Sequence, residues 1–208
     1  MTEADLEHAL AQLSAGKVVA AATESFFGLL ADITNPEAVE ALFALKPRGA
    51  DKGVPTLIPS FEAWAPLVEG AIPALAQAFA AACWPGPLSI ALAARDAVSS
   101  RVALDGTLAV RVPGRSAAAQ LVARFGRPLS ATSANLPGAP PATEAAAVAR
   151  EFASAVARGD LFVVPGVSPG GAPSTVVAVR GAEYRVARAA AVPISALDAI
   201  ANRCAGSA

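Results

Sequence analysis

Apolar residues in this chain occur in short runs that Gly and Pro interrupt, and this pattern limits the fold more than any other feature. Segments such as 17–22 and 88–92 have the length of a β-strand and are bounded by turn-forming residues. No run approaches the roughly 20 consecutive apolar residues that a membrane-spanning helix requires. We therefore expect short strands combined with amphipathic helices, and no membrane contact.

Predicted helices alternate with these strands. Helices are expected from Thr2 to Gly16, from Asn35-Pro36 to about residue 45, twice within 60–83, and over 116–125 and 143–156. Strands are expected at 17–22, 55–58, 88–92, 107–112, 128–131 and 161–164, with a hairpin of 174–179 and 183–187. This order is typical of an α/β fold around one mixed, strongly twisted sheet. We expect one domain over 1–190 and a tail, 191–208, that can form a last helix from Ile194.

Cysteine and histidine are too scarce for several common chemistries. The one histidine, His8, lies in a predicted surface helix, which disfavours a Ser-His-Asp hydrolase and a zinc site of the usual type. Cys83 and Cys204 are far apart and are interpreted as reduced thiols. The acidic N-terminus lacks the pattern of a secretion signal, so a cytoplasmic location is expected. A net charge of −1 gives no general attraction to nucleic acid.

Cationic residues gather where the second predicted helix ends. Lys46 and Arg48 stand at this point, and Lys52 follows in a loop that contains glycine. Cations at a helix C-terminus interact favourably with the helix dipole, so a solvated helix end is one interpretation. The other is a phosphate clamp, because Arg offers a planar fork of donors and Lys a point charge.

Arg111 interrupts an otherwise apolar strand. Alternation places Leu108, Val110 and Val112 on one face, with Thr107, Ala109 and Arg111 on the other. An edge strand with one solvent-exposed face would explain the charge. The alternative is an anchor for a carboxylate in a cleft, where the small Ala109 leaves room for a ligand.

Hydroxyl-bearing side chains follow other strands and turns. Residues 130–135 (Ser-Ala-Thr-Ser-Ala-Asn) come directly after a strand, as do Thr23 and Ser25, and Ser174 follows a glycine-rich turn. Such residues at the carboxyl end of a strand can contact a ligand, or they can merely cap turns. No Walker P-loop motif occurs in the chain.

Together and in this order, these segments resemble the YrdC/Sua5 family of threonylcarbamoyl-AMP synthases. The matching segments are 23–29, 45–53, 84–88, 109–113, 130–135 with Gly138 and Pro140, and 173–177. The chain departs from the family pattern at Ala22 and Gly49, where prolines are usual, at Ser25, and at Ala190, where a glycine is usual.

The resemblance implies a YrdC-like fold and the synthesis of threonylcarbamoyl-AMP from L-threonine, bicarbonate or CO2, and ATP. Lys46, Arg48, Ser133 and Asn135 would form the catalytic set. Lys46, Arg48 and Lys52 would hold the triphosphate; Thr107, Ser133, Asn135 and Arg188 would contact the nucleotide; Thr23, Arg111 and Ser174 would bind threonine. Mg²⁺ would arrive on the ATP phosphates rather than in a protein metal site.

The product would pass to the complex that transfers threonylcarbamoyl to tRNA. Two alternatives stay open. One is a paralogue that acts on another carbamoyl-adenylate, and the other is a non-catalytic module that binds double-stranded RNA. The low net charge favours at most weak RNA binding.

Overall fold

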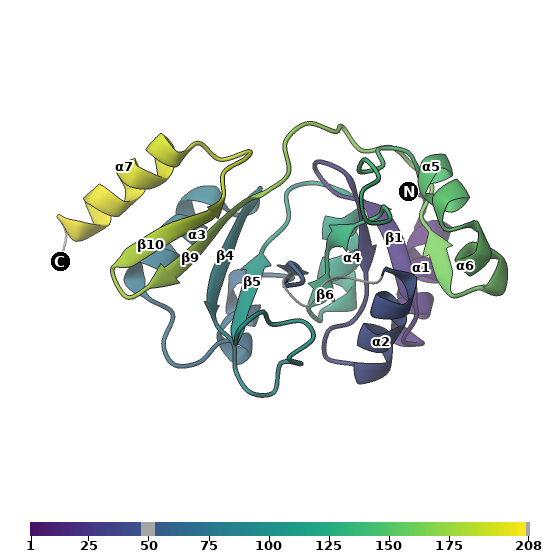
Figure 1. Cartoon of the computed structure of the whole chain (residues 1–208), viewed down its shortest axis with the longest axis horizontal. Helices are drawn as coiled ribbons and strands as arrows, with labels where there is room; N and C mark the ends of the chain where they lie inside the picture. Colours follow the sequence, from purple (N-terminus) through teal and green to yellow (C-terminus); the bar gives the residue numbers. More distant parts are fainter. Residues whose placement is uncertain (47–52, 207–208) are drawn as a thin grey trace.

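The structure, a computed structural model, describes residues 1–46 and 53–206. In this part of the chain the strands form two mixed sheets rather than the single one expected. The first sheet has the order β7-β2-β1-β8, and the second has the order β10-β9-β4-β5-β3-β6. Helices flank both sheets (Figure 1), so the α/β class is confirmed.

The strands are short throughout. The first sheet contains β1 (Val18–Ala22), β2 (Phe27–Leu30), β7 (Thr132–Ser133) and β8 (Leu161–Val163); the second contains β3 (Thr56–Leu57), β4 (Leu88–Ala93), β5 (Thr107–Arg111), β6 (Leu129–Ser130), β9 (Thr175–Arg180) and β10 (Glu183–Arg188). Parallel pairs join β1 to β8, β3 to β5 and β4 to β9. β2 was not predicted, because it begins only four residues after Thr23, in a segment that was interpreted as a ligand-contacting or capping turn.

A bent segment, residues 129–133, joins the two sheets. From the sequence it was treated as part of one continuous sheet, which explains why one sheet was expected instead of two. β6 pairs with β3 of the second sheet, and β7, only two residues later, pairs with β2 of the first. The Ser130 hydroxyl accepts a hydrogen bond from the amide of Ala31 and donates one to the carbonyl of Leu29. The hydroxyl-rich segment 130–135 therefore lies at the junction.

The helices are α1 (Glu3–Ser14), α2 (Pro36–Leu45), α3 (Ala74–Cys83), α4 (Ala117–Phe125), α5 (Ala145–Glu151), α6 (Ala153–Arg158) and α7 (Ile194–Ala205). Thr2 and Asp5 form a capping box at α1, and Asn35 caps α2 through its side chain. Figure 1 shows α1, α2, α5 and α6 in one half of the molecule, and β4, β9, β10, α3 and α7 in the other.

Two predicted helices differ from the structure. Only α3 forms within 60–83, because residues 61–67 make the 3₁₀ turns η1 (Phe61–Ala63) and η2 (Ala65–Leu67), with Pro66 inside η2. The predicted helix 143–156 is divided at Phe152, whose φ of −108° and ψ of 30° leave the helical region while its ring is buried. Core packing of that ring overrides the continuous pattern.

The tail forms the last helix that the sequence suggested. α7 packs on α3 and buries Leu197 and Ile200. The Tyr184 hydroxyl on β10 donates a hydrogen bond to Asp198 on α7 at 2.5 Å, and its ring contacts Phe79 of α3 edge-on. A domain boundary at residue 190 stays a prediction.

Candidate active site

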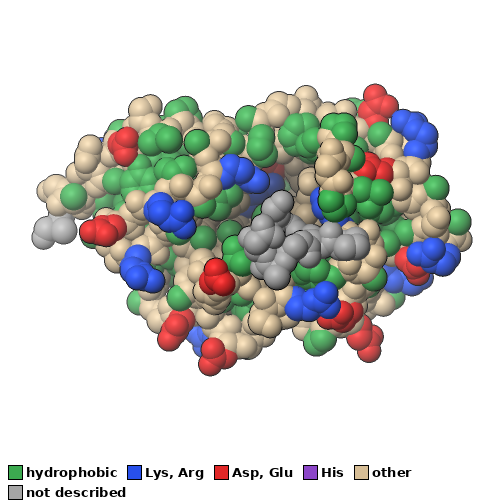
Figure 2. All heavy atoms as spheres, in the orientation of Figure 1, with side chains coloured by type: hydrophobic (Ala, Val, Ile, Leu, Met, Phe, Trp, Pro, Cys, Tyr) green, Lys and Arg blue, Asp and Glu red, His purple; other side chains and the backbone are tan. Residues whose placement is uncertain are grey.

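A cleft of about 380 Å³ lies where the two sheets meet. It is lined by Thr23, Ser25, Phe26, Phe27, Gly28, Pro55, Arg111, Ala131, Thr132, Ser133, Pro141, Pro173, Ser174 and Arg188. Five of the ten residues that the sequence assigned to the site are in this lining: Thr23, Arg111, Ser133, Ser174 and Arg188. Figure 2 shows Lys and Arg side chains around a hollow near the centre of this face of the molecule.

The ends of strands deliver these side chains. Arg111 ends β5, Arg188 ends β10, and Ser133 ends β7, while Thr23 and Ser174 stand just outside β1 and β9. β5 lies between β4 and β3, so Arg111 is on an interior strand and the edge-strand interpretation is wrong. Polar residues at strand ends are a common arrangement for ligand sites in α/β proteins.

Arg111 is buried and paired. Its side chain is 7% exposed and forms an ion pair with Glu24. Burial lowers the pKa of Arg111, the charge and hydrogen bond of Glu24 raise it, and the nearby Arg188 lowers it further. Burial also lowers the pKa of Arg188. An arginine side chain is not deprotonated in proteins, so both guanidiniums carry a positive charge.

This arrangement leaves a positive charge for a ligand. Glu24 neutralises one of the two guanidiniums, and its second oxygen, Oε2, is buried without a hydrogen-bond partner among the described residues. A half-buried site with this charge attracts an anion, because a guanidinium in low dielectric interacts strongly with carboxylate or phosphate. The local charge supports the anchor interpretation of Arg111.

Lys46 forms a second cationic group beside the cleft. Its side chain follows α2 and is buried, so the solvated-end interpretation is wrong for this residue. The ammonium donates to the Ser133 carbonyl at 2.6 Å, to the Ser133 hydroxyl at 3.1 Å and to Asn135 Oδ1 at 3.1 Å. The structure thus brings together three of the four residues of the expected catalytic set. Arg48, the fourth, and Lys52 lie outside the described residues.

Thr23 uses its hydroxyl within its own turn. Oγ1 donates to the Phe26 carbonyl at 2.7 Å and accepts from the amides of Ser25 and Phe26. These bonds occupy the hydrogen and both lone pairs, so the hydroxyl has little capacity left for a ligand. The neighbouring Ser25 also lines the cleft, and its hydroxyl lies 3.3 Å from Thr23 Oγ1.

Ser174 and Arg188 are joined across the β9–β10 pair. Arg188 donates from Nε to the Ser174 carbonyl at 2.9 Å and from Nη2 to the Ser174 hydroxyl at 3.0 Å. The same hydroxyl lies 3.2 Å from that of Ser89 on β4. Thr175, one residue later, ties the strand to the chain after Arg188 by accepting from the amides of Ala190 and Val192.

Thr107 is not part of this cleft. It begins β5, whereas Arg111 ends the same strand, and it lines a separate depression of about 570 Å³ with Glu69, Arg180 and Arg185. Strand alternation placed Thr107 on the correct face but could not tell how far along the strand the site extends. Its proposed contact with the nucleotide stays a prediction.

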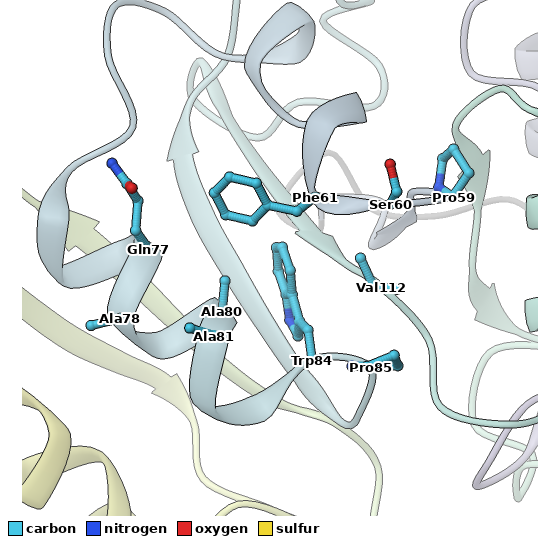
Figure 3. A pocket seen from close by; sticks show the side chains of 10 residues that line it. All are labelled: Pro59, Ser60, Phe61, Gln77, Ala78, Ala80, Ala81, Trp84, Pro85 and Val112. Atoms are coloured by element: carbon cyan, nitrogen blue, oxygen red, sulfur yellow. The ribbon is translucent and has the colours of Figure 1, made fainter.

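A larger pocket than this cleft lies elsewhere. It measures about 720 Å³ and is formed mainly by apolar side chains of η1, α3 and the turn after it, including Phe61 and Trp84 (Figure 3). Its lining contains no charged side chain, and of the residues near the cleft it includes Val112. This larger pocket is therefore not suited to bind an anion, although its volume exceeds that of the cleft.

Sequence reasoning missed two residues. Glu24 was part of a matching segment without a role, and Ser89 was treated as an ordinary strand residue. A usable signal existed for Ser89, because a hydroxyl in the otherwise apolar strand 88–92 must find a partner. Nothing in the sequence links Glu24 to Arg111, which is 87 positions away.

Comparison with known proteins places the chain in a family. Residues 11–190 match the Sua5/YciO/YrdC family model, whose description is telomere recombination. The threonylcarbamoyl-AMP synthase of Klebsiella pneumoniae is 36% identical over 168 residues, which cover 79% of this chain and 84% of that protein. The enzyme of the same name from Vibrio parahaemolyticus is 37% identical over 139 residues, covering 66% and 75% of the two chains.

The chain belongs to the Sua5/YciO/YrdC family.

Solved structures of this family have the same fold. Pyrococcus abyssi Sua5, in a complex with L-threonine, superposes with a TM-score of 0.86 at 30% identity. The match covers 96% of this chain but only 58% of the Sua5 chain. Escherichia coli YciO, at 20% identity and a TM-score of 0.77, shows the shared fold alone. Among the described residues of this family member, the helices are too short or too polar to cross a bilayer.

Proposed function

We propose that this chain is a threonylcarbamoyl-AMP synthase, which makes threonylcarbamoyl-AMP and pyrophosphate from L-threonine, CO2 or bicarbonate, and ATP. The product serves N6-threonylcarbamoyladenosine formation in tRNA. The observation that carries the proposal is the cleft in which Arg111, Arg188 and Ser174 lie together with Ser133 and, through it, Lys46. Relatives that match most of their own length bear this enzyme name.

The reaction needs alignment and charge stabilisation more than proton transfer. The amine nitrogen of threonine bonds to the carbon of CO2 and releases a proton to water, giving N-carboxythreonine. A carbamate oxygen then attacks the α-phosphorus of ATP, the bond to the pyrophosphate oxygen breaks, and pyrophosphate leaves. Preorganised cations and hydroxyl donors stabilise the charge that moves onto the phosphates.

The residues divide into two groups in this mechanism. Arg111 holds the threonine carboxylate, with Ser174 beside it, while Arg188 lies where both the threonine and the nucleotide can meet it. Lys46, Ser133 and Asn135 hold the phosphates, with Arg48 and Lys52 assigned to the same group from the family resemblance. Mg²⁺ enters as part of the ATP substrate, bound to phosphate oxygens, as is usual for nucleotides.

Ser25 keeps one alternative open, because it lines the cleft and departs from the family pattern. A side chain of different size at this position can change which amino acid fits, which favours testing a paralogue with another substrate. Pyrophosphate release should be measured with ATP, Mg²⁺ and bicarbonate, and with each of several amino acids. Release that depends on L-threonine supports the proposal. Release with another amino acid alone, or with none, refutes it.

The destination of the product is a further part of the proposal. The complex that transfers threonylcarbamoyl to tRNA is expected to accept threonylcarbamoyl-AMP from this enzyme. A coupled assay with tRNA and the transfer complex of the same organism should yield modified tRNA only when the chain is present. We expect direct RNA binding to be weak and to fall steeply as the salt concentration is raised.

A further inference from the structure

The buried hydroxyl of Ser89 stands directly behind the cleft. Ser89 lies on β4, is 0% exposed, and pairs in register with Val176 of the parallel strand β9. Its Oγ lies 3.2 Å from that of Ser174, which lines the cleft. Ser174 is the only side-chain hydrogen-bond partner of Ser89 among the described residues. Ser89 itself does not line the cleft, so it can act only through Ser174.

The direction of this hydrogen bond follows from the number of donors and acceptors. A serine hydroxyl has one hydrogen and two lone pairs, and a buried hydroxyl hydrogen almost always has an acceptor. The described residues offer Ser89 one such acceptor, the oxygen of Ser174. Ser89 therefore donates, and Ser174 accepts.

Ser174 receives a second donor from the opposite side, because Nη2 of Arg188 lies 3.0 Å from the same oxygen. Both lone pairs of Ser174 are then occupied, and its own hydrogen is left for a ligand. The side chain lines the cleft, and it lies beside the two guanidiniums. A hydroxyl fixed in this way donates to an anionic oxygen and cannot accept from an ammonium group.

We propose that Ser89 is a positioning residue that fixes Ser174 as a hydrogen-bond donor to the carboxylate of threonine. This inference rests on the proposed function, since it takes threonine as the ligand. It explains how the cleft distinguishes the two ends of an amino acid: the carboxylate meets Arg111 and Ser174, and the ammonium is turned away from them.

The test compares Ser89→Ala with Ser89→Thr by steady-state kinetics. Ser89→Ala should raise the KM for L-threonine by about 3- to 10-fold, while the KM for ATP stays within about 2-fold. Ser89→Thr keeps the hydroxyl and should restore most of the threonine affinity. Thr2→Ala, which removes a hydroxyl from the distant cap of α1, lowers the melting temperature without changing either KM and controls for stability.

A double variant separates positioning from a general structural role. If Ser89 acts through Ser174, then adding Ser89→Ala to Ser174→Ala should change the threonine KM no further. An additive effect, an unchanged KM in Ser89→Ala, or an impaired but folded Ser89→Thr would each overturn the inference. Calorimetric titration of the wild-type protein with L-threonine distinguishes a failure of this inference from a failure of the proposed function. Absence of threonine binding to the wild type would refute the proposed function as well as this inference. If the wild type binds threonine and Ser89→Ala binds it with the same affinity, the inference alone is refuted.

Discussion

Lys46 has its ammonium held by Ser133 and Asn135, so truncation removes a buried charge and leaves acceptors without a donor. Lys46→Ala should lower kcat/KM for pyrophosphate release by about 30- to 1,000-fold, the usual loss for one preorganised charged contact. Lys17→Ala is the control, because Lys17 is an exposed lysine that donates to the carbonyl of Gly159. Near wild-type turnover by a folded Lys46→Ala variant would contradict the assignment.

Glu24 offers a prediction about stability. Removing its carboxylate leaves Arg111 buried, unpaired and close to Arg188, so Glu24→Ala should lower the free energy of unfolding by about 3 kcal/mol. The matched control is Glu40→Ala, whose partner Arg101 is 46% exposed, and which should cost less than about 1 kcal/mol. Urea denaturation measures both values. Equal losses in the two variants would show that the Glu24–Arg111 pair is not effectively buried.

Individual site residues were predictable where local patterns reveal them. Arg111 is conspicuous as a charge in an apolar strand, and Ser133 and Asn135 follow a strand directly. Partners distant in sequence were not predictable, as the Glu24–Arg111 and Ser89–Ser174 contacts show. Thr23 illustrates the opposite limit, because a hydroxyl after a strand can bond within its own turn instead of to a ligand.

The turn between α3 and β4 depends on a glycine. A Cβ added at Gly86 would overlap the carbonyl oxygen of Cys83, which is backbone and cannot move easily. Gly86→Ala should therefore destabilise the protein by about 1–3 kcal/mol. Gly206→Ala, where the nearest atom would lie at an ordinary 3.6 Å, should change stability by less than about 0.5 kcal/mol. Thermal denaturation of the two variants checks the difference, and similar melting temperatures would contradict it.

The contact between β10 and α7 can be followed through the one tyrosine of the chain. Burial and the hydrogen bond and charge of Asp198 raise the pKa of Tyr184 from 10.0 to about 12. Because the folded-state pKa is raised, this stabilising contribution is present below pH 10 and is lost as the pH rises toward about 12. Ultraviolet absorbance of tyrosinate measures the titration directly.

Asp198→Ala provides the test of that contact. It removes two of the three causes of the shift, so the pKa of Tyr184 should fall toward its ordinary value and α7 should be held less firmly. A titration that is identical in Asp198→Ala and the wild type would contradict the contact.

Secondary structure was predictable where the periodic pattern agreed with packing, as in α1, α2, α4 and the β9–β10 hairpin. It was not predictable where tertiary packing overrides local preference. Phe152 enters the core and divides a helical pattern, and the short segment 129–133 turns from one sheet to the other. The division into two sheets depends on pairing between strands that are far apart in sequence, and a local sequence pattern does not predict such pairing.

At the scale of the whole molecule, the cleft forms only because the two sheets meet. The first sheet contributes β2, β7 and Thr23, which follows β1. The second sheet contributes the ends of β5 and β10 and Ser174, which precedes β9. Such a cleft suits a reaction that must hold an amino acid and a nucleotide against each other. The proposed division of the residues into a carboxylate group and a phosphate group follows the same architecture.

The most direct measurement is the mass of the nucleotide that forms when the protein receives ATP, Mg²⁺, L-threonine and isotopically labelled bicarbonate. We expect an adenylate whose mass equals threonylcarbamoyl-AMP with one labelled carbon, together with pyrophosphate, and no such species without threonine. Folded, nucleotide-binding protein that produces no labelled adenylate would contradict the proposed function.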